Sequence, residues 1–228
     1  MKRSLVLVAA VVFLIGPSCG KKSPTSPHYW NDGWDFGTND QNLFVALGDS
    51  ITEGAGDSTF QGCFIDYEGY PKRLQAKLGD KKKVVNEGVC GEASVHGAQR
   101  VNAVLAKYKP GYLLILYGYN DRCACQGVMD WLRIIIQAAK ANKTIPIIGT
   151  MNGDNPDVEA MNPLIRDLAR QEGIVVADIW QAFENDPRYQ QNHDALLYPD
   201  GYGMHPNDAG YDVMAQAWYD TIVANFRL

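Results

Sequence analysis

The sequence predicts an α/β protein, a three-layer α/β/α sandwich in which five parallel strands lie between two layers of helices. Two observations lead to this fold class. Short apolar runs, rich in Val, Ile, Leu and Tyr, alternate along the chain with segments whose apolar residues recur every three or four positions. The first pattern is typical of strands buried on both faces, and the second is typical of helices with one buried face.

The elements can be placed in chain order. Strands are expected at 43–47, 83–86, 112–118, 145–151 and 174–179. Apolar stripes place helices around 101–108, 132–139 and 158–168, and a last helix that begins near Pro206 and continues over 211–222. Because strands and helices alternate, the strands should run parallel, and ligands of such sheets bind beyond the carboxyl ends of the strands.

Length and composition fit one ordinary globular domain. The chain has 228 residues, of which 46% are hydrophobic and 21% are charged, so it can build a core of its own. Its formal net charge is −5, and an acidic chain is a poor ligand for nucleic acid. We therefore expect a monomer without a nucleic-acid partner.

Residues 1–18 have the pattern of an export signal peptide. Two basic residues precede an apolar run from Leu5 to Ile15, which is too short to span a bilayer. Gly-Pro-Ser before Cys19 resembles a bacterial lipobox, although Gly16 stands where such boxes usually have Leu. We expect a lipid on Cys19 that holds the protein in the periplasm or cell envelope and is its only membrane contact; secretion after ordinary cleavage is the alternative.

The remaining chain divides into a tether and a domain. Residues 19–41 include a polar stretch rich in Pro and Ser without periodicity, which indicates a flexible linker. The folded domain is expected over 42–228.

Four cysteines follow Cys19, and an even number in an exported protein predicts two disulfide bonds. A bond between Cys123 and Cys125 would close a very tight ring. We therefore expect each of these two to pair with Cys63 or Cys90, and four free buried thiols are the alternative.

Three loops after predicted strands carry polar or glycine residues of interest. Ser50, in ALGDSITEG, follows the first strand and is either a nucleophile or a helix cap that forms a capping box with Glu53. Gly91 follows the second strand and can offer its backbone N–H to an oxyanion or simply form a turn. Asn120 follows the third strand and offers an amide donor, although Asn-Asp is also a common turn pair.

His205 follows the fifth strand at a distance and stands just before the last predicted helix. The dipole of that helix disfavours imidazolium, so we expect a neutral ring that can accept a proton. A lone His is more often structural, but all four stretches reach the same edge of the predicted sheet. Acyl transfer needs a nucleophile, a base in contact with it and donors for the oxyanion, and these loops supply all three.

These stretches resemble the four blocks of the GDSL, or SGNH, hydrolase family. The blocks are GDS at 48–50, a glycine block with Gly91, GYND at 118–121 and HPND at 205–208. Each block alone is a weak signal, but the four occur in the family's order across 43–222.

The resemblance implies a flavodoxin-like fold in which Ser50 attacks an ester and His205 is the general base. It also implies an oxyanion hole made by the N–H groups of Ser50 and Gly91 and the side chain of Asn120. No cofactor and no metal belong to the mechanism that the resemblance implies.

One block departs from the family pattern, because members usually carry Asp three residues before the His, where this chain has Tyr202. Asp200 stands further upstream, so two residues, one of them Gly203, would have to loop out for Asp200 to reach His205. We favour Asp200 as the supporting acid. A Ser-His dyad assisted by Tyr202 or by water is the alternative.

The sequence therefore predicts a serine esterase or acylhydrolase that cleaves carboxylic esters of small or short-acyl substrates. A carbohydrate O-deacetylase with the same site is one alternative. A surface lipoprotein that binds a ligand without turning it over is another.

Overall fold

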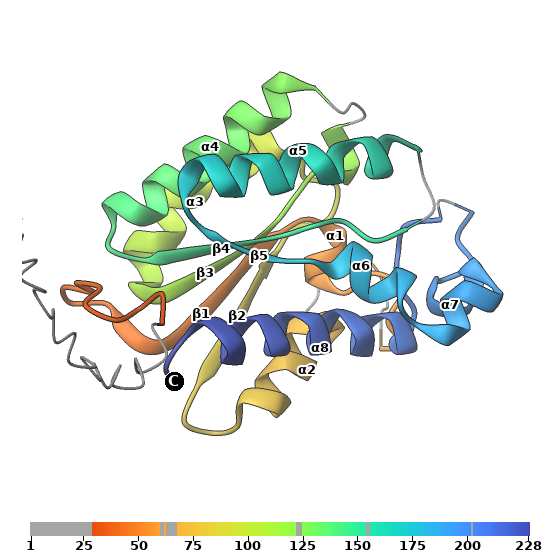
Figure 1. Ribbon diagram of the computed structural model, residues 1–228, viewed down its shortest axis with the longest axis horizontal. Coiled ribbons are helices and arrows are strands. Elements are labelled where there is room, and N and C mark those ends of the chain that lie inside the picture. The colour runs from red at the N-terminus through yellow and green to blue at the C-terminus, as the bar shows by residue number, and fades with distance from the viewer. Residues whose placement is uncertain (1–28, 60–61, 63–67, 122–124, 154–155, 202) are drawn as a thin grey trace, which may run out of the picture.

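The computed structural model describes residues 29–59, 62, 68–121, 125–153, 156–201 and 203–228 (Figure 1). One sheet of five parallel strands runs through the domain in the order β2-β1-β3-β4-β5. The strands are β1 (Asp40–Gly48), β2 (Lys83–Gly88), β3 (Pro110–Leu116), β4 (Ile145–Gly149) and β5 (Val175–Ala177).

Helices cover both faces of the sheet, which confirms the predicted three-layer α/β fold (Figure 1). One face carries α3 (Ser94–Tyr108), α4 (Gln126–Ala141) and α5 (Pro156–Glu172); the other carries α2 (Gly69–Leu78) and α8 (Asp208–Asn225), with α6 (Ile179–Glu184) packed against α8. The short elements are α1 (Ser50–Glu53), η1 (Tyr119–Asp121), α7 (Pro187–Gln191) and η2 (His193–Leu196).

The strand β1 lies inside the sheet and is paired with β2 on one side and β3 on the other. Its residue Phe44 lies opposite Val84 of β2 and Tyr112 of β3. The whole of β3 is buried, as is β1 from Leu43 onwards. Burial on both faces explains why these strands are continuous apolar runs without alternation.

Several predicted boundaries are wrong by a few residues. Strand β3 ends at Leu116 and β4 at Gly149, although the apolar pattern continues through Tyr117 and Met151. Both of these residues are buried in loops that pack under helices, and burial without ladder hydrogen bonds looks the same in a sequence. The last helix begins at Asp208, because Pro206 instead forms an isolated antiparallel bridge.

The folded body begins earlier than predicted, because the segment 29–39, assigned above to the tether, packs against the domain. The Trp30 N–H donates to the carbonyl of Asn225 at 2.9 Å, and the Trp34 indole N–H donates to the carbonyl of Lys143 at 3.0 Å. Phe36 is buried in the core. The segment is too short to show a helix or strand period, so its aromatic residues gave no sequence pattern that predicts packing.

The first and last described residues meet at the edge of the sheet opposite the carboxyl ends of the strands (Figure 1). The predicted signal 1–18 and Cys19 lie outside the described residues. Within the part of the chain that is described, no helix combines the length and the apolar character needed to cross a bilayer.

Two of the four cysteines that follow Cys19 lie in the described part of the chain. Cys90 and Cys125 are each disulfide-bonded. Cys63 and Cys123 lie outside the described residues, so the pairing stays a prediction.

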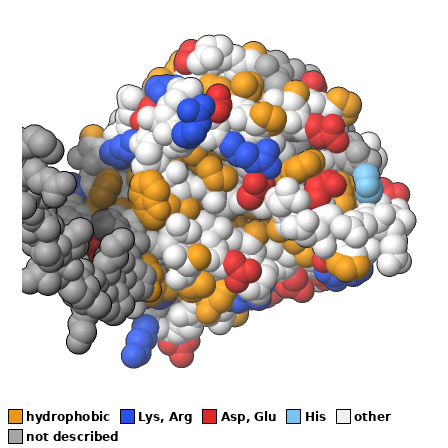
Figure 2. Space-filling view, viewed as in Figure 1, with side chains coloured by type: hydrophobic (Ala, Val, Ile, Leu, Met, Phe, Trp, Pro, Cys, Tyr) orange, Lys and Arg blue, Asp and Glu red, His pale blue; other side chains and the backbone are white. Residues whose placement is uncertain are grey.

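The outer helices carry charged side chains of both signs. Figure 2 shows Lys and Arg interspersed with Asp and Glu over α4 and α5. Arg133 and Lys140 of α4 both contact Glu172 of α5, at 2.5 and 3.1 Å. These pairs join the two helices at the surface, where ion pairs typically contribute up to about 1 kcal/mol each.

The central strand should be intolerant of truncation. We expect Leu114→Ala in β3 to lower the free energy of unfolding by about 2 to 5 kcal/mol, because Leu114 is fully buried and its loss leaves a cavity. Urea unfolding followed by circular dichroism measures the change. The matched control is Ile134→Ala on α4, where the side chain is 43% exposed; a loss as large as that of Leu114→Ala would contradict the packing described here.

Candidate active site

Ser50 is the first residue of α1, and only Asp49 separates it from the end of β1. The helix is capped by the preceding residue, Asp49, whose side chain accepts a hydrogen bond from the Ile51 N–H at 3.0 Å. The alternative in which Ser50 forms a capping box with Glu53 is therefore wrong, because Asp49 already provides the cap. The hydroxyl of Ser50 remains available for other contacts.

That hydroxyl contacts the side chain of His205. The Ser50 Oγ lies 3.0 Å from His205 Nε2, although 155 positions separate the two residues. Ser50 itself is 7% exposed. The distance is within the range for direct proton transfer between a nucleophile and its base.

The other ring nitrogen, His205 Nδ1, is hydrogen-bonded to the carboxylate of Asp200. With the Nδ1–H donating to Asp200, Nε2 has a free lone pair for the proton of Ser50. The structure thus brings together Ser50, His205 and Asp200. This is the arrangement expected if two residues are inserted before His205 relative to the family pattern. Tyr202, the alternative partner, lies outside the described residues.

A closed loop allows Asp200 to reach the imidazole. An antiparallel bridge between Leu197 and Pro206 holds the ends of the loop, and the Tyr198 N–H donates to the histidine carbonyl at 2.8 Å. Inside the loop, Gly201 and Gly203 have φ angles of 80° and 65°. Glycine adopts this left-handed region without the strain of a side chain, so the extra residues turn the loop back on itself.

Besides the Ser50 N–H, the other two predicted oxyanion donors, Gly91 and Asn120, lie on loops on either side of β1. The loop with Gly91 is held by hydrogen bonds from Val89 N–H to the Gly48 carbonyl (3.0 Å) and from Glu92 N–H to the Val89 carbonyl (3.2 Å). The Asn120 amide, in η1, donates to the carbonyl of Glu92 at 3.0 Å. One N–H of that amide fixes its orientation, and the second can serve a ligand.

Arg100 of α3 supports these loops and was not found by the sequence analysis. Its guanidinium donates to the carbonyls of Glu87 (2.7 Å) and Gly48 (3.3 Å) and to the carboxylate of Glu92 (2.9 Å). The Tyr117 hydroxyl donates to the same carboxylate at 2.7 Å. Arg100 therefore connects the ends of β1 and β2, but an Arg in an amphipathic helix gives no sequence signal for this role.

A fourth loop, after β4, also reaches the site and was passed over in the sequence. The Asn152 amide donates to the carbonyl of Met204 at 2.9 Å, and its oxygen accepts from the Tyr119 hydroxyl at 2.7 Å. Asn152 is fully buried, so it fixes the residue before the histidine from the interior of the domain. The signal was present as a polar Asn directly after an apolar strand.

Asp49 is a buried carboxyl next to the nucleophile. Its pKa is raised to about 7, chiefly by burial; the hydrogen bond from the Ile51 N–H lowers this pKa, and the nearby charges of Asp121 and Glu92 add to the rise. Its second oxygen, Oδ2, has no hydrogen-bond partner among the described residues. Near neutral pH this side chain therefore exchanges between the charged and neutral forms.

The hydroxyl, imidazole and carboxylate together can carry out nucleophilic catalysis, with amide donors nearby for a developing negative charge. Within the described ranges, no three His, Cys, Asp or Glu side chains are grouped as ligands for a metal ion.

The shifted pKa of Asp49 predicts a pH-dependent stability. The folded protein holds this proton up to a pKa of about 7, against 3.8 in the ordinary case, so the free energy of unfolding should fall as pH rises from about 4 to about 7. Asp49→Asn lacks this titration, and relative to the wild type it should gain up to about 4 kcal/mol over that window. Urea unfolding at a series of pH values tests this; parallel pH profiles of the two proteins would contradict it.

Comparison with known proteins shows the family of the chain. The sequence matches the GDSL-like lipase/acylhydrolase family over residues 46–213. Over 110 residues it is 29% identical to the thioesterase 1/protease 1/lysophospholipase L1 of Escherichia coli, a match that spans 47% of this chain and 50% of that protein. Over 84 residues it is 37% identical to the esterase TesA of Pseudomonas aeruginosa, spanning 36% of this chain and 38% of that one.

The chain thus matches half or less of the length of these two relatives. A solved structure, the lipase/acylhydrolase from Enterococcus faecalis, superposes with a TM-score of 0.64 at 20% identity and covers 79% of this chain and 94% of that one. This likeness shows a common fold. Because the family model matches residues 46–213, which is more than half of the chain, the chain belongs to the GDSL-like lipase/acylhydrolase family of hydrolases.

Proposed function

We propose that the protein is a serine esterase that hydrolyses carboxylic esters of small or short-acyl substrates through an acyl-enzyme on Ser50. The observation that carries the proposal is the chain of contacts from Ser50 Oγ to His205 and on to Asp200. A merely structural histidine would not need both a serine hydroxyl and a carboxylate on opposite ring nitrogens.

In the first half of the reaction, Ser50 Oγ attacks the ester carbonyl carbon while its proton moves to His205 Nε2. The carbonyl π electrons move onto oxygen, and the resulting oxyanion accepts hydrogen bonds from the Ser50 and Gly91 N–H groups and the Asn120 amide. Asp200 stabilises the imidazolium that forms. When the carbonyl re-forms, the C–O bond to the alcohol breaks, and the alcohol leaves with the proton from Nε2.

In the second half, water takes the place of the alcohol. His205 removes its proton as the hydroxide portion attacks the acyl-enzyme, and the same donors hold the second oxyanion. Collapse of this intermediate breaks the bond to Ser50 Oγ, which takes its proton back from Nε2. The carboxylic acid is released and the site returns to its initial state.

The nucleophile is tested by Ser50→Ala. We expect ester hydrolysis to fall to the background rate, because the variant lacks the hydroxyl that lies 3.0 Å from His205 Nε2. Hydrolysis of p-nitrophenyl acetate measures turnover, and mass spectrometry after treatment with a fluorophosphonate locates the covalent adduct. An adduct on another residue, or an active Ser50→Ala variant, would refute the acyl-enzyme on Ser50.

The acid is tested by comparing Asp200→Asn with Tyr202→Asp. We expect Asp200→Asn to lower kcat by up to about 10⁴-fold, since an amide cannot stabilise imidazolium or hold the productive tautomer. Tyr202→Asp should bring no gain if Asp200 already occupies the partner position of His205. Nearly full activity of Asp200→Asn, or faster turnover by Tyr202→Asp, would overturn the assignment of the acid.

A substrate panel separates the alternatives that share this site. We expect kcat/KM to be greatest for short-acyl esters, with about two to four acyl carbons, and to decline for longer chains. Acetylated xylan and chitin fragments form a second arm, and preference for them would favour the carbohydrate O-deacetylase. Ligand binding without a fluorophosphonate adduct would favour the non-catalytic lipoprotein.

We also propose that the protein is exported and held in the cell envelope by a lipid on Cys19. The support is the sequence pattern alone, since residues 1–28 lie outside the described residues. Cys19→Ser should move the protein from the membrane fraction to the soluble fraction, while a wild-type protein found only in the soluble fraction would rule out the anchor.

A further inference from the structure

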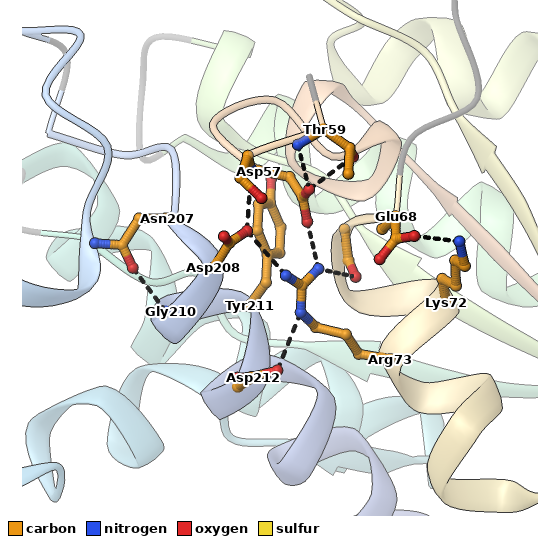
Figure 3. A network of polar contacts seen from close by, with 12 residues as sticks. Asp57, Thr59, Glu68, Lys72, Arg73, Asn207, Asp208, Gly210, Tyr211 and Asp212 are labelled. Carbon is orange, nitrogen blue, oxygen red and sulfur yellow. Dashed lines mark hydrogen bonds and ion pairs between the residues drawn. The ribbon is translucent and has the colours of Figure 1, made fainter. Parts of the chain in front are cut away.

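Arg73 of α2 is the centre of an ionic cluster (Figure 3). Its guanidinium forms an ion pair with Asp57 and contacts Asp208 at 2.9 Å and Asp212 at 3.0 Å. It also donates to the carbonyl of Gly69 at 3.0 Å. We call Arg73, Asp57, Asp208 and Asp212 the Arg73 cluster.

The Arg73–Asp57 pair of this cluster is enclosed, whereas the side chains of Asp208 and Asp212 are 48% and 69% exposed. The Arg73 side chain is 17% exposed, and that of Asp57 is fully buried. Burial by itself raises the pKa of Asp57, but hydrogen bonds from Thr59 and the Arg73 guanidinium together outweigh burial and hold this pKa below its ordinary value. The carboxylate is therefore charged, and without Arg73 it would be buried with no cation beside it.

The acids of the cluster come from the two segments that carry the reacting groups. Asp57 belongs to the segment 54–58, which directly follows α1 and therefore Ser50. Asp208 begins α8 and stands just after His205 in the HPND block. One guanidinium thus connects the nucleophile's side of the site with the base's side.

The segment 54–58 lies directly against the start of α8. The Ser58 N–H donates to the Asp208 carboxylate at 3.0 Å, and the Tyr211 hydroxyl donates to the carbonyl of Ala55 at 2.7 Å. A Cβ atom on Gly56 would lie 2.4 Å from the Pro206 carbonyl oxygen, so the two backbones touch there.

The same segment is connected to the nucleophile through its backbone. The carbonyl of Ser50 accepts the N–H groups of Gly54 and Ala55, each at 2.9 Å. A displacement of 54–58 relative to α8 would therefore change the separation of Ser50 and His205. In the described contacts Arg73 binds the segment 54–58 and the start of α8, so its effect on chemistry would pass through these two segments.

We propose that Arg73 is a positioning residue, which holds the segment 54–58 against the start of α8 and thereby sets the distance between Ser50 Oγ and His205 Nε2. The inference rests on the proposed esterase function. Proton transfer to a base is sensitive to such distances, and a misplacement of about 1 Å can cost about 100-fold in rate.

The experiment compares Arg73→Gln and Arg73→Lys with the control Lys72→Gln. Lys72 is the neighbouring residue on α2, is exposed, and pairs only within its own helix turn, with Glu68, in the described contacts (Figure 3). The values of kcat and KM are measured with p-nitrophenyl acetate at a temperature where circular dichroism shows each variant to be folded.

We expect Arg73→Gln to lower kcat by about 10- to 100-fold and to leave KM within about twofold. His205 acts in both acylation and deacylation, so both steps slow together and their ratio, which enters KM, is preserved. Arg73→Lys should recover part of kcat, because an ammonium restores the charge without the planar fork that reaches several carboxylates. Lys72→Gln should change neither constant.

Hydrogen exchange supplies a readout that does not depend on catalysis. In Arg73→Gln, amides in 54–58 should exchange faster than in the wild type and in Lys72→Gln, since the Ser58 N–H is held by Asp208. If Arg73→Gln does not fold, Asp208→Asn serves in its place. The fold-loss in kcat caused by Asp208→Asn should be smaller in an Arg73→Lys background than in the wild type.

The outcomes separate this inference from the proposed function. A folded Arg73→Gln variant with wild-type kcat, or unchanged exchange in 54–58, overturns the role of Arg73 while leaving the esterase proposal intact. A wild-type protein that hydrolyses no ester and forms no fluorophosphonate adduct overturns the esterase, and the exchange measurement then decides alone whether Arg73 holds the two segments together.

Discussion

The site depends on the position of β1, an interior strand with a parallel partner on each side. Parallel neighbours bring three carboxyl ends to one edge, so Ser50, after β1, is flanked by the loops that follow β2 and β3. From β1 the chain adds β2 on one side of the sheet and then β3 on the other, and open α/β sheets leave room for a ligand at such a point. The Gly48 carbonyl at the end of β1 accepts from Val89 of one neighbouring loop, so the spacing of nucleophile and donors is set by backbone geometry.

The histidine is held in a different way, because no strand delivers it to the edge. His205 lies in a loop between η2 and α8, and its position depends on contacts made by side chains and by short backbone bridges. Asn152 fixes the preceding residue from inside the domain, and Asp200 closes the loop onto the ring. The sheet thus positions Ser50 and the loops beside it, whereas polar contacts between loops position His205 and Asp200.

This division explains how much could be predicted from the sequence. Apolar runs and helix periods predicted the sheet, its helical layers and the loops that carry Ser50 and Asn120, because burial leaves a regular pattern. The inserted register around Gly203 indicated that Asp200 could reach the histidine, and the structure places the two in contact. The contacts of Arg73 could not be predicted, because its partners Asp208 and Asp212 lie 135 and 139 positions away and a partly exposed Arg on a helix looks the same whether or not it has them.

The contact between the first and last described segments has a practical meaning for protein engineering. Trp30 and Asn225 are hydrogen-bonded at the edge of the sheet remote from Ser50, so in a variant of residues 29–228 a short peptide would join the two termini without crossing the domain. Such a circular permutant, opened in a surface turn such as 79–82, would keep every strand in its place. Attachment to a bead through residue 29 or 228 of such a variant would likewise be made at the edge of the sheet remote from Ser50.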